Sequence, residues 1–351
     1  MSLLFLMGFF LVIGCGEKEK QASKGSPDKK KEEGLPAKYN PDSLQKELEE
    51  LNERIKKNPQ NADLYYQRAG VKKRQGNIQL AIEDMKRALR IDSTRSDLHQ
   101  RMGTLYFRNR NVKRSKKHFR RAIALDGENT KAYIGLADLY RATRQYQNAI
   151  DYANEALKVD PHLARPYTIK GLVHQQTGDT SKAISSFRTT VEMDPKNYAA
   201  FLQLGYLMAA RDRDLAIEYY NTAHRLQPQD PRPLYNKAYY LKEHGRPDKA
   251  IKTYKELIGI DTGYVEAYYD IGHIHLVQKD DPRKGLEWFN KTIDLSPEYH
   301  QALYNRGLCY EKLGKKDSAI ADYRKALRIK ENFRLAAKGL QRLGAKYQGD
   351  R

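Results

Sequence analysis

Few side chains in this sequence have the types and spacings that carry catalysis or bind a metal ion. The two cysteines, Cys15 and Cys309, form no Cys-x-x-Cys pair for zinc. His273 and His275 are near neighbours, but residues two apart on an α-helix point about 200° away from each other. The sequence contains no Walker loop, Gly-x-Gly-x-x-Gly, nucleophile elbow or His-Glu-x-x-His motif. We therefore predict a non-enzymatic protein without metal or cofactor, in which His275 and Cys309 are core residues.

Cys15 has a sequence context of its own. It follows an apolar run from Leu3 to Ile13 that is 11 residues long, whereas a membrane-spanning helix needs about 20. Such a run suits the apolar part of a secretory signal. The residues Val12-Ile13-Gly14-Cys15 resemble the lipobox of bacterial lipoproteins, although the usual Lys or Arg before the apolar run is absent. The resemblance implies a signal peptide over 1–14 and lipidation of Cys15; the alternative is an incidental cysteine in a cytosolic protein.

The segment behind this cysteine is predicted to be a tether. Residues 15–41 are rich in charge, Ser, Gly and Pro, and lack the apolar surface that offsets the entropy of ordering a chain. A predicted N-terminal capping helix follows within 42–61, where apolar residues recur at three- and four-residue steps as Leu44, Leu48, Leu51 and Ile55.

From residue 62 to residue 333 the sequence repeats with a period close to 34 residues. A small residue recurs at Ala69, Gly103, Ala137, Gly171, Gly205, Ala238, Gly272 and Gly307. A second small position falls at Ala81, Ser115, Ala149, Ala183, Ala216, Ala250, Gly285 and Ala319, and is followed four residues later by Met85, Phe119, Ala153, Phe187, Tyr220, Tyr254, Phe289 and Tyr323. Small residues let two helices approach closely, and bulky ones fill the space between neighbouring pairs.

The unit from Tyr133 to Pro161, with its Leu-Ala, Tyr140, Ala149 and closing proline, resembles the tetratricopeptide repeat (TPR). The resemblance implies an all-α, right-handed α-solenoid superhelix of about eight helix pairs, each an A helix and a B helix. A C-terminal capping helix and tail are expected over 334–351. The extra or missing residues of repeats seven and five are expected between helices A and B. Basic residues replace the usual Leu-like residue of helix A at Arg68, Lys170, Lys237 and Arg306, which predicts looser packing there.

Proteins that resemble this family usually bind peptides or proteins in a concave groove lined by the A helices. The resemblance places the following residues in the C-terminal half of that groove: Gln203, Tyr206, Tyr235, Asn236, Tyr239, Tyr269, Asp270, Tyr304 and Asn305. Amides offer the donors and acceptors that a peptide backbone requires, and tyrosines add contact area. Alternatively, the tyrosines simply pack between adjacent A helices. A clamp for a C-terminal carboxylate would need Lys and Asn where repeat one has Tyr66 and Gly70, so that mode is not supported.

The first two repeats, 62–129, are strongly basic, with 17 Lys and Arg against 7 Asp and Glu. The densest part is a basic patch of Arg108, Arg110, Lys113, Arg114, Lys116, Lys117, Arg120 and Arg121, most of which belongs to a B helix and is therefore expected on the convex side. It is either a solvated charged face or a docking face for anionic lipid, envelope polymer or an acidic partner.

These observations predict a lipid-anchored scaffold that binds envelope proteins or extended peptides in its groove and reaches the membrane through Cys15. Gly16 lacks the acidic character that retains enterobacterial lipoproteins at the inner membrane, which favours the outer membrane facing the periplasm; the charged GEKEK stretch also resembles surface-export signals. Nucleic acid is not expected as a partner, because an exported lipoprotein rarely meets it. The alternatives are a cytosolic adaptor without a lipid and an envelope protein that binds anionic polymer or lipid through the basic patch.

Overall fold

The computed structural model describes residues 41–346; Cys15, the predicted signal peptide and nearly all of the predicted tether lie outside the described residues. The described chain contains 18 α-helices packed in pairs, which confirms the predicted all-α solenoid. The A helices are α2 (Ala62–Arg74), α4 (Ser96–Arg108), α6 (Thr130–Ala142), α8 (Ala164–Gln176), α10 (Tyr198–Ala209), α12 (Arg232–Glu243), α14 (Val265–His273) and α16 (His300–Lys312). The B helices are α3 (Ile78–Ile91), α5 (Val112–Leu125), α7 (Tyr146–Val159), α9 (Thr180–Met193), α11 (Leu215–Leu226), α13 (Pro247–Ile260), α15 (Pro282–Leu295) and α17 (Lys316–Ile329).

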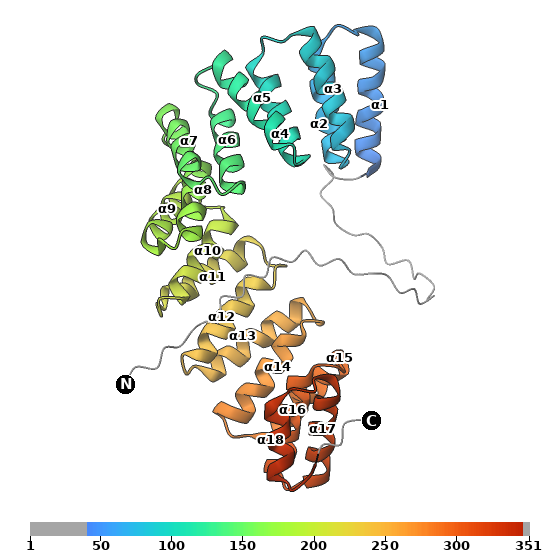
Figure 1. Cartoon of the computed structure of the whole chain (residues 1–351), viewed down its shortest axis with the longest axis vertical. Coiled ribbons are helices and arrows are strands. Elements are labelled where there is room, and N and C mark those ends of the chain that lie inside the picture. The colour runs from blue at the N-terminus through green and yellow to red at the C-terminus, as the bar shows by residue number, and fades with distance from the viewer. Residues whose placement is uncertain (1–40, 347–351) are drawn as a thin grey trace.

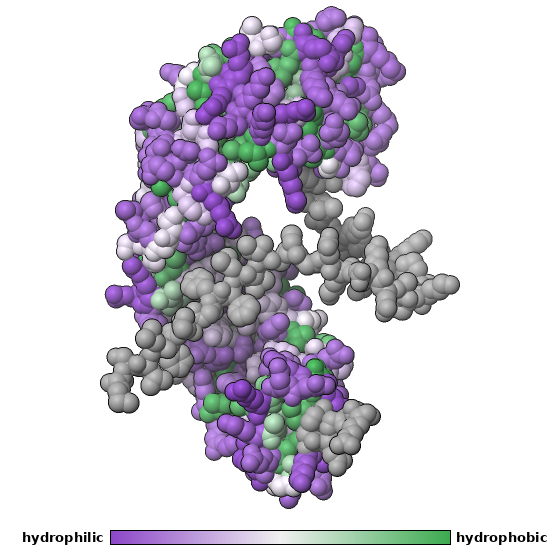
Figure 2. Space-filling view, in the orientation of Figure 1, coloured by the Kyte–Doolittle hydropathy of each residue, from purple (hydrophilic) through white to green (hydrophobic). Residues whose placement is uncertain are grey.

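The array curves along its length (Figure 1), with α1 (Pro41–Lys57) at one end and α18 (Arg334–Arg342) at the other. A helices of consecutive repeats contact one another directly, as α4 does α6, α6 does α8 and α10 does α12. The A helices therefore line the inner face of the curve. Figure 2 shows a mostly hydrophilic surface in which hydrophobic residues appear in small, separate groups, as expected when the apolar stripes are buried between stacked repeats.

In five of the eight helix pairs, those of repeats two, four, five, seven and eight, a ring from the B helix lies on a glycine of the A helix. A Cβ atom on Gly103 would lie 2.7 Å from the ring of Phe119, and one on Gly205 would lie 2.5 Å from the ring of Tyr220. The ring of Phe119 also covers Gly135 of the next A helix, where a Cβ atom would approach it to 2.4 Å. One buried ring thus fixes the distance to two A helices, its own and that of the next repeat.

Two of the four basic residues in the A helices, Arg68 and Arg306, do not loosen the packing as predicted. The Arg68 guanidinium donates to both carboxylate oxygens of Asp84 on α3, at 2.9 and 2.6 Å, and to Oδ1 of Asn52 on α1 at 2.7 Å. Asp84 is only 4% exposed. Arg306 repeats this arrangement with Asp322 on α17 and Asn290 on α15. A buried charge is tolerated when it is paired and fully hydrogen-bonded, and these two arginines satisfy that condition.

The same contacts explain how the two end helices cap the array. Asn52 on α1 meets Arg68 as Asn290 on the B helix α15 meets Arg306, so α1 occupies the place of a B helix of a preceding repeat. At the other end, Gly339 on α18 lies under the ring of Tyr323, where a Cβ atom would approach to 2.6 Å. The helix α18 therefore occupies the place of an A helix.

The extra residue of repeat seven lies elsewhere than predicted. The helix α14 continues as a π-helical segment, η2 (Ile274–Gln278), which makes the first helix of this repeat one residue longer. The turn itself keeps its usual form, with Asp280 at a φ of 47° where other repeats have Gly76 or Gly314. The insertion is thus absorbed by a wider helical turn, a known way to accommodate one residue without displacing the helix. In repeat five, α10 and α11 have 12 residues each, against 13 and 14 in α8 and α9, and the connection between them is not shortened, so the missing residue is taken from the helix ends.

The close contact between ring and glycine predicts a sharp difference between two glycines. Gly135→Ala places a methyl group against the buried ring of Phe119 and should destabilise the protein by about 1–3 kcal/mol. Gly259→Ala, on the exposed side of α13 with no atom within 4 Å of its Cβ position, should be neutral or stabilise by about 0.5–1 kcal/mol, because glycine is a poor helix former. Thermal unfolding followed by circular dichroism measures both, and equal effects at the two sites would contradict this packing model.

Candidate binding site on the inner face

Three consecutive repeats in the C-terminal half contain the same aromatic triad. Each has a tyrosine on the A helix, a ring on the B helix and a ring just before the next A helix, as Tyr235–Tyr254–Tyr264, Tyr269–Phe289–Tyr299 and Tyr304–Tyr323–Phe333. The ring centroids lie 5.1–5.9 Å from that of the A-helix tyrosine. Burial raises the pKa of Tyr235, Tyr269 and Tyr304, so their phenols stay protonated at neutral pH. These three tyrosines are therefore packing residues as well as candidates for the groove.

The predicted amide ladder links neighbouring A helices. Asn236 on α12 donates to the hydroxyl of Tyr206 on α10 at 3.2 Å, and Asn305 on α16 donates to the hydroxyl of Tyr269 on α14 at 2.9 Å. Gln203 accepts a hydrogen bond from Gln175 Nε2 on α8 at 2.9 Å. Each of these polar side chains crosses to the preceding A helix, so part of its hydrogen-bonding capacity is used within the fold.

Asp270 is buried, 5% exposed, and lies at the same position of its repeat. It accepts from Lys242 Nζ at 2.8 Å and from the Tyr254 hydroxyl at 2.9 Å. Burial lowers the pKa of Lys242, but the charge and hydrogen bond of Asp270 outweigh this effect and raise it. The ammonium of Lys242 also lies 4.5 Å from the centre of the Tyr239 ring. Lys242, which the sequence patterns did not single out, and Tyr254, which they predicted only as a packing residue, thus complete a buried network beneath Tyr239.

Tyr239 is the most exposed of the predicted groove tyrosines, with 46% of its surface accessible. It stands three or four residues from Tyr235, Asn236 and Lys242, and therefore shares with them the side of α12 that faces α10 and α14. Its ring is 6.5 Å from that of Tyr235, and the Lys242 ammonium lies over it. The inner face of repeat six thus presents one pre-positioned aromatic ring to solvent.

The basic patch divides between two surfaces. Lys113, Lys117 and Arg121 are exposed on the B helix α5, whereas Arg110 lies in the preceding turn with a φ of 56°. Three further members hold aromatic rings: Arg114 lies over Tyr106 at 5.6 Å, Lys116 over Tyr140 at 4.9 Å, and Arg120 donates to the Tyr140 hydroxyl at 3.3 Å. Arg108 ends the A helix α4, and its charge lowers the pKa of Lys73 on α2. It therefore belongs with the A helices rather than with the rest of the patch.

Three family models, each described as tetratricopeptide repeat, match parts of the chain. The matched residues are 62–95, 101–164, 170–231, 206–265, 235–300 and 300–333. One of these models covers more than half of the chain. The chain belongs to the tetratricopeptide repeat family. The paired helices, the ring-on-glycine contacts and the 34-residue period are all properties of one repeated unit.

Two curated relatives match parts of this TPR chain. Tetratricopeptide repeat protein 6 of Homo sapiens is 27% identical over 139 residues, which are 37% of this chain and 25% of that protein. Protein FlbA of Caulobacter vibrioides is 23% identical over 152 residues, which are 43% of this chain and 25% of that protein. The chain thus spans a quarter of the length of each relative.

Two solved structures share the fold. The C-terminal part of a TPR repeat-containing protein from Cytophaga hutchinsonii has a TM-score of 0.61 at 18% identity and covers 69% of this chain and 99% of that chain. PilF of Pseudomonas aeruginosa has a TM-score of 0.51 at 22% identity and covers 59% of this chain and 94% of that chain. At these identities the likeness is one of fold.

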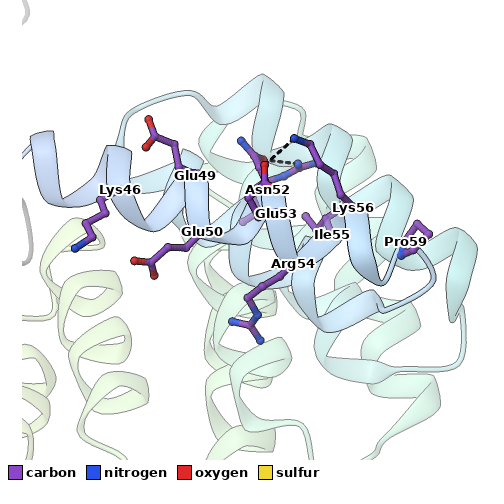
Figure 3. Close-up of a pocket in the computed structure, with 10 residues that line it drawn as sticks. Lys46, Glu49, Glu50, Asn52, Glu53, Arg54, Ile55, Lys56 and Pro59 are labelled. Carbon is purple, nitrogen blue, oxygen red and sulfur yellow. Dashed lines mark hydrogen bonds and ion pairs between the residues drawn. The ribbon is translucent and has the colours of Figure 1, made fainter.

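An open depression of about 1110 Å³ runs along the capping helix α1 and includes Arg68. Figure 3 shows that its labelled side chains, among them Lys46, Glu50 and Arg54, splay apart along the helix rather than converge. Opposite charges alternate there, and Lys56 pairs with Glu53 at 2.6 Å. The depression therefore lacks the convergent polar groups that mark a ligand site.

Within residues 41–346 no group of three or more His, Cys, Asp or Glu side chains could hold a metal ion, and no helix is long and apolar enough to cross a membrane. Cys309 is fully buried, as predicted, and burial raises the pKa of its thiol to about 12. His275 is 7% exposed, which confirms it as a core histidine. These residues support the packing of repeats seven and eight.

A pair of histidines behind the basic patch predicts a pH-dependent stability. His99 Nδ1 and His118 Nδ1 are 3.0 Å apart. Burial, and then the charge of His99, lowers the pKa of His118 from 6.5 to about 4. Between these values the unfolded chain binds a proton that the folded chain does not, so stability falls as the pH is lowered through this window. The melting temperature should decrease between pH 7 and pH 4.5, with a shallower slope in His118→Gln; an unchanged slope would refute the role of His118.

Proposed function

We propose that this TPR chain is a non-enzymatic scaffold that holds extended peptide segments of partner proteins on the inner face of its C-terminal repeats. The observation that carries the proposal is the exposed ring of Tyr239, which lies beside the Tyr235 ring and under the Lys242 ammonium. A tyrosine that is already held in place contributes contact area to a partner at low entropy cost. The surrounding hydrogen bonds between A helices fix the helix spacing, so the surface is largely formed before a partner arrives.

Tyr239 is also the residue best suited to test this proposal. Tyr235, Tyr269 and Tyr304 belong to the aromatic triads, so their removal would disturb the fold along with the groove. Tyr239 exposes almost half of its surface, and so does Leu80 on the B helix α3, at 46% each. Leu80 lies far from the inner face of repeat six and is a matched control for the loss of an exposed apolar side chain.

Tyr239→Ala should weaken the binding of peptides selected from a random dodecapeptide library by about tenfold or more, because an aromatic anchor at the centre of an interface is a typical hot spot. Peptides are selected on the full-length protein, and their affinities for the two variants are measured by fluorescence anisotropy. Leu80→Ala should bind as the unaltered protein does. Equal affinities for Tyr239→Ala and the unaltered protein would reject the inner-face site.

We further propose that the scaffold is anchored by a lipid on Cys15 to a bacterial envelope membrane, in keeping with the outer membrane facing the periplasm. The support is the lipobox-like Val12-Ile13-Gly14-Cys15, the apolar run before it and the charged 15–41 segment as a tether. One acyl chain alone gives only marginal membrane binding, whereas a lipoprotein cysteine with more than one chain anchors stably. The partners would then be proteins of the envelope.

Cys15→Ala should shift the protein from the membrane fraction to the soluble fraction, and the unaltered protein should show a mature N-terminus at an acylated Cys15 in mass spectrometry. Cys309→Ala is the control, because that thiol is buried in the core. An unprocessed, unmodified N-terminus in its natural host would instead favour the cytosolic adaptor.

A further inference from the structure

The inner face of the first two repeats carries a cluster of cations that shares only Arg108 with the basic patch. It consists of Lys73 and Arg74 at the end of α2, with Arg101 and Arg108 on α4. Arg101 and Arg108 are seven residues apart, and Lys73 is seven residues from Tyr66, so each pair lies on one side of its helix. We call these four residues the inner cationic cluster.

Arg101 joins the two helices of the cluster. Its guanidinium lies over the ring of Tyr66 on α2, 5.3 Å from the centroid. Its Nη2 atom occupies the space beside Gly70, where a Cβ atom would approach it to 3.2 Å. The absence of a side chain at position 70 therefore lets the guanidinium cross from α4 to α2. An arginine stacked on an aromatic ring is also held in one orientation, which reduces the entropy lost when it binds.

The cations of this cluster lie close together, and among the described residues only Arg74 has a carboxylate as a partner. Burial lowers the pKa of Lys73, and the charges of Arg101, Arg108 and Arg74 lower it further. Arg74 pairs with Glu47, but within residues 41–346 no carboxylate forms an ion pair with Lys73, Arg101 or Arg108. The Nε atoms of Arg74 and Arg101 are buried without a hydrogen-bond partner. Within the described residues Arg101 donates no hydrogen bond, so its terminal Nη atoms, and not the buried Nε, are the donors that an anion could use.

The extent of the cluster indicates the size of that anion. Neighbouring A helices lie about 8–10 Å apart, and alternate side chains of an extended peptide are about 7 Å apart. The cationic surface of the inner face also ends at the third repeat. In the third repeat Asp138 pairs with Arg165 at 2.9 Å and with Arg141 at 3.7 Å. A nucleic acid strand would instead require a continuous basic track.

We infer that the inner cationic cluster binds an acidic segment of a partner peptide, with two carboxylate side chains two residues apart. Guanidinium groups bind carboxylates in a bidentate, charge-assisted manner, which suits Arg101 and Arg108. The inference rests on the proposed function, since it extends the peptide from the aromatic C-terminal repeats to the first repeats. It differs from a terminal carboxylate clamp because the anions are side chains.

The test uses three fluorescein-labelled peptides of Gly and Ser with amidated C-termini, and the full-length protein. Two dodecapeptides carry Glu-Ser-Glu or Gln-Ser-Gln at their centre. The third is about twice as long, so that it can span the A helices from α4 to α12, and carries Glu-Ser-Glu near one end and two tyrosines near the other. Arg101→Gln and Arg108→Gln are compared with Lys117→Gln, which removes the same charge from the exposed face of α5. Arg108 is exposed at the end of its helix, so its variant keeps the fold even where Arg101→Gln alters it.

We expect the Glu peptides to bind at least about tenfold more tightly than the Gln peptide. This ratio of affinities should fall about tenfold in Arg101→Gln and in Arg108→Gln. It should not change in Lys117→Gln. Equal losses in all three variants would reduce the effect to net charge and overturn the inference. Binding of labelled oligothymidylate is measured as well. The inference is also overturned if this oligonucleotide binds more tightly than either Glu peptide and if Arg108→Gln weakens its binding. Tyr239→Ala separates the proposals, since it should weaken only the tyrosine-containing peptide and leave the response to Arg108→Gln intact.

Discussion

In five of the eight repeats the structure depends on one contact, in which a B-helix ring lies against a glycine of its own A helix and, in some repeats, against a second glycine of the next A helix. Phe119 between Gly103 and Gly135, and Tyr323 between Gly307 and Gly339, show both halves of this contact. The ring is large and fully buried, and the glycine lets the backbone approach within van der Waals distance of it. The A helices are consequently drawn together while the B helices stay further apart, which bends the array and places the A helices on its inner face.

The spacing that this contact imposes also brings side chains of neighbouring A helices within hydrogen-bonding distance. Asn236 reaches Tyr206, Asn305 reaches Tyr269, and Lys242 reaches Asp270 across that gap. Residues at these positions therefore have two possible partners, the adjacent repeat and a ligand. In this protein the adjacent repeat already uses part of the hydrogen-bonding capacity of these side chains. The surface that remains for a ligand is therefore formed mainly by aromatic rings and by cations that form no ion pair within residues 41–346.

The fold could be predicted from the sequence because it depends on local size alternation. The 34-residue recurrence of Gly or Ala, with a bulky residue at a fixed offset, predicts the helix pairs without knowledge of any distant contact. The partners of charged residues were harder to predict, because they lie on other helices. Arg68 and Arg306 looked like packing faults, yet each has an Asp 16 residues later and an Asn 16 residues earlier, and these satisfy its guanidinium. That spacing was present in the sequence, but its meaning depends on the distances between three helices.

The π-helical segment of repeat seven and the inner cationic cluster were missed for a related reason. A one-residue insertion can widen a helical turn or lengthen a loop, and only the packing around His275 decides between them. Likewise, a run of basic residues was assigned to one convex face, although its first member, Arg108, lies beside Lys73 of the preceding A helix. The number of charged residues in a segment does not indicate on which face of a helix each side chain lies.

The run Lys72-Lys73-Arg74 in α2 makes this distinction clear. Lys72 turns toward the B helix and pairs with Asp84 at 2.7 Å, together with Arg68. One residue later the helix has rotated by about 100°, and Lys73 lies near Arg101 and Arg108 and forms no ion pair with a carboxylate of residues 41–346. Cations that the packing requires are thus matched by anions within the fold. The folded chain gains nothing from holding like charges together, because their repulsion opposes folding and a neutral side chain would remove it. This repulsion supports the proposal that the inner cationic cluster binds an acidic segment of a partner peptide.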